Sequence, residues 1–145
     1  MKGKCLNIYK TSRLTAGITQ EHAAELLYIS TRSLADYETG RTVPPDDVVC
    51  RMIDTYGCKH LGYVHLKQNT KVGQRFLPDI NLADLPSSVL RLQKEVGDLS
   101  DINRDMLDIA CDGVVDEGEE RRWMSVTKEI KEVAGAALAV SFVGG

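Results

Sequence analysis

The stretch ISTRSLADYETG, residues 29–40, gathers short polar side chains that can form hydrogen bonds with a ligand outside the protein. Ser30 is a residue type that caps a helix and Gly40 one that ends it, so a short helix is expected between them. The first turn of such a helix would carry three polar side chains: Thr31, Arg32 and Ser33. Small or polar donors at a helix N-terminus can enter the major groove of DNA and reach base edges. The pattern therefore indicates a recognition helix, Thr31–Thr39, for double-stranded DNA.

A recognition helix needs a preceding helix to hold it against the DNA. Thr19 can cap such a helix, and the apolar residues that follow it keep helical spacing: Ala23, Ala24, Leu26 and Leu27. Three residues, YIS, separate this helix from the next. Two short helices joined by a turn of three residues form a helix-turn-helix.

Further cap and stop residues predict three more helices around this pair. Asn7 can cap a first helix that runs through Ala16 and ends at Gly17. The stretch PPDDVVCRMIDTYG predicts a fourth helix with Pro45 in its first turn and Gly57 as its stop. HLGYVHLKQ is a short fifth helix. The N-terminal half is thus expected to be a five-helix domain.

The segment GITQEHAAELLYISTRSLADYETGRTVPP resembles the phage-repressor helix-turn-helix family, the Cro-like or xenobiotic-response-element group. The likeness covers residues 7–66 and is carried by residues at fixed spacing: Gly17, Thr19, Gln20, Ala24, Ile29, Ser30, Leu34, Tyr37, Glu38 and Gly40. TRSLADYETGRTVPPDDVV, followed by YGCKHLGYVHLK, is similar to small regulators of Gram-positive prophages. The resemblance implies a lambda-repressor-like DNA-binding domain in a transcriptional regulator.

The resemblance also implies roles for individual residues. Gln20 would bond a phosphate or brace the first base contact, and an ion pair between Arg13 and Glu38 would join the first and third helices. Arg41 and Thr42 would hold phosphates. The predicted DNA-binding residues are Thr19, Gln20, Ser30, Thr31, Arg32, Ser33, Asp36, Arg41 and Thr42. The alternative for Arg32 is a solvated surface arginine, and for Arg41 and Thr42 a place in a loop without a DNA contact.

Two residues depart from the family pattern. Tyr28 stands in the turn where members usually carry Gly, and a left-handed backbone there would cost on the order of 1 kcal/mol. Asp36 stands where basic or amide residues are common. A carboxylate repels phosphate and among base edges suits mainly the amino group of cytosine, so Asp36 weakens the case for base reading.

The formal charge of −3 is unevenly distributed. Up to Pro78 there are 11 Lys and Arg residues against 7 Asp and Glu, a net charge of +4. From Asp79 onward there are 7 against 14, a net charge of −7. The N-terminal half can therefore approach phosphate, whereas the acidic half is expected to sit away from it.

The predicted domains are residues 1–67 as the DNA-binding domain, 68–86 as a connector and 87–145 as an acidic antiparallel helical hairpin. Apolar residues at steps of four and three predict a heptad seam along its first helix: Leu85, Val89, Leu92, Val96, Leu99, Asn103, Met106 and Ala110. A second amphipathic helix contains Trp123, Val126, Ile130, Val133, Ala137 and Val140. Two helices alone bury little, so the seam needs a homodimeric partner or, alternatively, the N-terminal domain.

The turn of the hairpin partly fits a calcium-binding loop. From Asp108 to Glu119 several oxygen ligands surround Gly113, as in the twelve-residue EF-hand template. Ala110 occupies the third position and offers no side-chain ligand. The alternative is a helical hairpin in which Gly113 ends the first helix and acidic residues begin the next.

The remaining cysteine and histidine residues do not form a recognisable metal or catalytic motif. Cys58, His60 and His65 are loosely spaced, whereas zinc needs four convergent ligands. The four cysteines are expected to be reduced and mostly buried. An enzyme is not expected, because no nucleophile–base set or phosphate-binding Gly loop is evident.

The sequence thus predicts a sequence-specific DNA-binding transcriptional regulator, a prophage-type repressor in the bacterial cytoplasm and nucleoid, without a cofactor. The alternative is a protein-interaction adaptor, antitoxin-like or antirepressor-like, with a vestigial helix-turn-helix and an acidic hairpin that binds a protein partner. A signal peptide is not predicted, because the first residues lack an apolar region.

Overall fold

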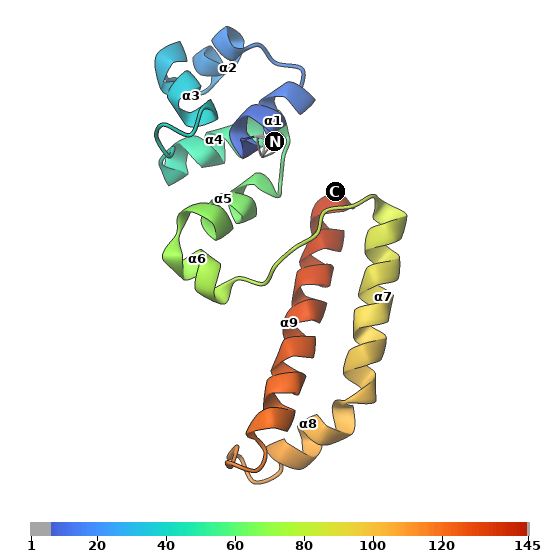
Figure 1. Ribbon diagram of the computed structural model, residues 1–145. Helices are drawn as coiled ribbons and strands as arrows, with labels where there is room; N and C mark the ends of the chain where they lie inside the picture. Colours follow the sequence, from blue (N-terminus) through green and yellow to red (C-terminus); the bar gives the residue numbers. More distant parts are fainter. Residues whose placement is uncertain (1–6, 145) are drawn as a thin grey trace, which may run out of the picture. The chain divides into compact units, whose positions relative to one another are not determined.

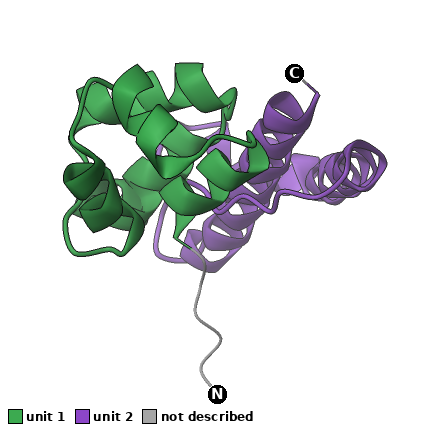
Figure 2. Cartoon of the chain, turned by 90° about the horizontal axis from the view of Figure 1, so that it is seen from above, with its two compact units in different colours: residues 1–77 green, residues 78–145 purple. Residues whose placement is uncertain are grey.

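The computed structural model describes residues 7–144, which contain helices and no strand, so the all-α prediction is confirmed (Figure 1). The chain divides into two compact units, residues 1–77 and 78–145 (Figure 2). Each unit is described by itself. The segment 68–86, predicted as a connector, contains one further helix, Lys71–Phe76, and the first residues of another.

The first unit contains six helices within the described residues. They are α1 (Ile8–Thr15), α2 (Gln20–Leu26), α3 (Thr31–Glu38), α4 (Asp46–Tyr56), α5 (Leu61–Asn69) and α6 (Lys71–Phe76). The predicted caps are confirmed: the side chains of Asn7, Thr19 and Ser30 accept backbone N–H groups of α1, α2 and α3. Gly57 ends α4 in the left-handed conformation.

The first three helices end in the same hydrogen-bonded motif. After α2, Tyr28 donates its backbone N–H to Glu25, and Ile29 donates to Ala24. This is a Schellman motif, which requires a left-handed residue between helix and loop. Gly17 and Gly40 take that position after α1 and α3, with φ of 71° and 75°. Tyr28 takes it after α2 with φ of 55°, so the left-handed turn expected from the sequence is present with a tyrosine in it.

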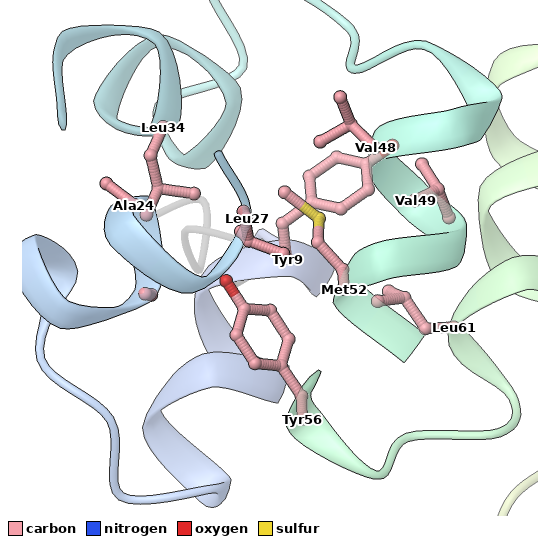
Figure 3. Packing of buried hydrophobic residues seen from close by; sticks show 10 residues of the cluster. Tyr9, Ala24, Leu27, Leu34, Val48, Val49, Met52, Tyr56 and Leu61 are labelled. Atoms are coloured by element: carbon pink, nitrogen blue, oxygen red, sulfur yellow. The ribbon is translucent and has the colours of Figure 1, made fainter. Parts of the chain in front are cut away.

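The core of the first unit lies where α1, α2, α3, α4 and α5 meet (Figure 3). Its buried members are Tyr9, Ala23, Ala24, Leu27, Leu34, Val48, Val49, Met52, Tyr56 and Leu61. Leu27 is the last residue before the turn, and Leu34 lies inside α3. Because both are fully buried, the angle between α2 and α3 is set by packing.

The second unit contains three helices, α7 (Leu85–Asp101), α8 (Asn103–Ala110) and α9 (Glu120–Val143). The predicted hairpin is confirmed, with α7 and α9 packed along each other (Figure 1). Its first arm was predicted as one helix, but it is interrupted at Ile102, which has φ of −102° and ψ of 5°. Gly97 lies within uninterrupted α7.

The predicted heptad seam faces the hairpin interior only in part. Leu85, Val89 and Val96 are 46%, 38% and 42% exposed. Ser88 and Glu95, which lie one position before the last two of these, are buried instead. The apolar pattern alone could not place the inner face, because the buried stripe of α7 depends on how this helix packs along α9.

One further prediction concerns the cysteines. Cys50 and Cys111 are exposed, so the expectation of mostly buried thiols is wrong for these two, whereas Cys5 lies outside the described residues. Among residues 7–144, no helix has the length and apolar character needed to cross a membrane.

Candidate nucleic-acid interface

The N-terminus of α3 is open to solvent. Ser30 accepts the backbone N–H of Ser33 at 3.0 Å, and their hydroxyl groups are 2.8 Å apart. Thr31 and Arg32 follow this cap and are exposed. Within the described part of the chain, no hydrogen bond or ion pair holds the guanidinium of Arg32. Thr31 and Arg32, two of the side chains predicted to contact DNA, are therefore available to a ligand.

Asp36 and Arg41 form an ion pair at the other end of α3. Arg41 Nη1 donates to Asp36 Oδ1 at 2.6 Å, and the Arg41 side chain is 71% exposed. The backbone N–H of Arg41 also donates to the carbonyl of Asp36, because Gly40 turns the chain back over the helix end. The pair offsets the carboxylate charge that made Asp36 unsuited to DNA. The sequence spacing of five residues across a glycine was the only signal for this contact.

Gln20 is oriented toward the protein. Its side-chain amide donates to Glu38 Oε2 at 2.9 Å. Thr19 is exposed, and its hydroxyl accepts the backbone N–H of His22. Thr42 is exposed after α3. The DNA contacts predicted for Gln20, Thr19 and Thr42 stay predictions.

A buried ion pair fixes α3 against α1. Arg13 Nε and Nη2 donate to the two oxygens of Glu38 at 2.6 and 3.0 Å, as the resemblance implied. Arg13 Nη1 donates to the carbonyl of Ile18 at 2.7 Å. The hydrogen bond to Glu38 raises the pKa of Arg13, so the guanidinium stays charged. A bidentate pair adds directional constraint, and here it sets the orientation of the helix that presents Arg32.

The charge distribution follows the two units. Residues 1–77 contain all 11 Lys and Arg residues counted up to Pro78, and their net charge is +4. Residues 78–145 have a net charge of −7. Positive charge in the unit that carries α3 favours approach to phosphate.

The loop between α8 and α9 does not have the geometry of a calcium site. Helix α8 continues to Ala110, so the first and third positions of the expected loop are helical. Asp112 and Asp116 accept backbone N–H groups of the loop itself. The only grouping of three metal-ligating side chains in residues 7–144 lies elsewhere, between α7 and α9.

Cys58, His60 and His65 do not converge either. Cys58 Sγ lies 3.4 Å from His60 Nε2 and accepts the hydroxyl of Ser12 at 3.4 Å. Burial lowers the pKa of His60. His65 turns away to the hydroxyl of Tyr9 and the carboxylate of Asp46. The side chains therefore offer no zinc site.

Comparison with known proteins supports the geometry of the first unit. Residues 10–60 match the model of a family described as helix-turn-helix domain. The chain thus carries a helix-turn-helix domain of the kind found in DNA-binding regulators. Searches of the curated proteins and of the solved structures each found no significant match.

Proposed function

We propose that this protein is a sequence-specific transcriptional regulator that reads the major groove with α3. The observation that carries the proposal is the exposed, capped N-terminus of α3, where Thr31 and Arg32 project without a protein partner among the described residues. Arg can donate two hydrogen bonds to guanine, which distinguishes guanine from other bases. The function is one of binding rather than catalysis.

Regulators of this shape generally bind DNA as symmetric dimers, with two recognition helices ~34 Å apart along the groove. The second unit supports a homodimer because α7 leaves Leu85, Val89 and Val96 exposed on one stripe. A second copy could cover that stripe in a four-helix arrangement. The same proposal includes two finer points. The protein would repress transcription from a prophage-type operator, and it would act in the bacterial cytoplasm, on the nucleoid.

The test is selection of bound DNA from a random pool, followed by titration of the selected sequence and a scrambled one. Arg32→Ala should weaken binding to the selected sequence roughly 5- to 150-fold, the equivalent of ~1–3 kcal/mol for one base contact. Binding to the scrambled sequence should change far less. Arg104→Ala removes the same charge from an exposed position on α8 and is the matched control.

The alternative, a protein-interaction adaptor, predicts a different result in the same experiment. The pool would yield no enriched sequence at micromolar protein, and Arg32→Ala would behave like Arg104→Ala at every salt concentration. That outcome would refute the assignment of α3 as a reading helix.

A further inference from the structure

Three glutamates meet between α7 and α9 in the second unit, with Glu95 buried, Glu129 half-buried and the side chain of Glu132 exposed. Glu95 comes from α7, and Glu129 and Glu132 come from α9, where a spacing of three places them on the same helical face. One carboxylate oxygen from each residue lies within 4.8 Å of the other two. Helices α7 and α9 run side by side (Figure 1). The grouping therefore joins residues more than thirty positions apart in the sequence.

Glu95 is buried without a hydrogen bond. The residue is 5% exposed, and its Oε2 has no hydrogen-bond partner among the described residues. Oε2 of Glu129, in the same cluster, is also buried and unpaired. A buried carboxylate oxygen without a partner is costly, so native structures almost always supply one. Two such oxygens in one cluster indicate a missing positively charged or proton-donating partner.

The neighbouring basic side chains do not take that place. Lys94 Nζ is 3.7 Å from Glu95 Oε1, but it donates to Asp98 at 2.6 Å. Arg91 Nε is 3.9 Å from the same oxygen. Lys128 Nζ is 3.7 Å from Glu132. All three distances exceed those of hydrogen bonds. These cations therefore balance part of the negative charge but form no hydrogen bond with the buried oxygens.

We propose that Glu95, Glu129 and Glu132 bind one hard divalent cation, of the class of Mg²⁺, Mn²⁺ or Ca²⁺. These ions prefer oxygen ligands, and the cluster contains no sulfur or imidazole that would favour zinc. Ligands on opposite sides of such an ion are ~4 to 5 Å apart, twice the metal–oxygen distance. The three carboxylate oxygens lie within 4.8 Å of one another, which is inside that range. The ion would clamp α7 to α9 in a unit whose net charge is −7.

The proposal is tested on the full chain after removal of metal with a chelator and dialysis. Mn²⁺, Mg²⁺ and Ca²⁺ are each titrated alone, Mn²⁺ binding being followed by electron paramagnetic resonance and the others by calorimetry. Unfolding of the second unit is followed by the fluorescence of Trp123, the only tryptophan of the chain. We expect one site per chain for at least one ion and a higher Tm for that unit when the ion is present.

The variants separate this site from other acidic groups. Glu95→Gln should weaken cation binding at least tenfold and abolish the rise in Tm, while the metal-free protein remains folded, because an uncharged amide is less costly to bury. Glu129→Gln should have the same effect. It serves as a second test of the site in case Glu95→Gln does not fold. Asp112→Asn, in the loop between α8 and α9, is the matched control and should bind as the unchanged protein does.

Three results would overturn the proposal. They are no binding of any of the three ions at millimolar concentration, binding that Glu95→Gln and Glu129→Gln leave intact, and binding that Asp112→Asn removes. The first would mean that no divalent cation joins the three carboxylates, and the last would place the ion in the loop.

Discussion

Tyr28 occupies a position that the backbone reserves for glycine, and replacing it gives a sharp test of the helix-turn-helix geometry. The same Schellman motif ends α1, α2 and α3, with Gly17, Tyr28 and Gly40 at its left-handed position. Tyr28→Gly should therefore stabilise the first unit. Gly40→Ala makes the reverse change in the third motif and should destabilise it.

The magnitude follows from two opposing terms. A side chain in the left-handed region costs roughly 1–2 kcal/mol, and the additional freedom of glycine in the unfolded chain offsets about 0.5–1 kcal/mol of the relief. Tyr28 is 87% exposed, so little packing is lost with its ring. The net expectation is a gain of about 0.5–1 kcal/mol for Tyr28→Gly. A methyl group at Gly40 meets no atom within 4 Å, so Gly40→Ala should lose about the same amount through backbone strain alone.

Urea denaturation followed by far-UV circular dichroism measures both changes. Trp123, in the second unit, supplies an internal control, because its fluorescence transition should not move in either variant. In a thermal melt, the Tm of the first unit should likewise rise by about 2–8 °C for Tyr28→Gly, from the usual relation between stability and Tm in a small domain. A loss of stability in Tyr28→Gly would show that the tyrosine ring contributes more than its backbone costs, and the reasoning would be wrong.

Two further predictions concern buried polar groups of the first unit. Glu38→Ala should destabilise it by about 3–5 kcal/mol in urea denaturation, because the charge of Arg13 is left buried. The double variant Arg13→Met/Glu38→Leu should recover much of that loss of stability. Equal losses in the single and the double variant would contradict this account. Tyr56→Phe should leave the stability unchanged or raise it, since the Tyr56 hydroxyl has no hydrogen-bond partner in the described chain. Tyr9→Phe removes hydrogen bonds with His65 and Asn69, so it should lower the free energy of unfolding by about 1–3 kcal/mol. Burial raises the pKa of both tyrosines to about 12. The unfolded chain ionises first, near pH 10, so stability should be complete below about pH 10 and decline toward about pH 12. Urea midpoints measured across this range should decline less steeply for Tyr56→Phe.

The ends of the N-terminal helices could be predicted from the sequence because they depend on groups only a few residues apart. Asn7, Thr19 and Ser30 each cap the helix that follows, and the cap needs no distant partner. Gly40 ends α3 for the same local reason. The ion pair of Arg13 with Glu38 was expected only from the family resemblance, since nothing local joins residues 25 positions apart.

Tertiary structure decided which face of the hairpin is buried and which charges meet. Apolar spacing predicted an amphipathic arm over residues 85–110, but Leu85, Val89 and Val96 remain exposed. Glu95, which the sequence alone would place on the surface, is 5% exposed because α7 packs along α9. By itself the sequence determined that helices form here and where most of them end, since those are short-range effects of backbone and side chain. The burial of Glu95 and its meeting with Glu129 and Glu132 depend on the packing of α7 against α9, and helical periodicity does not specify that contact.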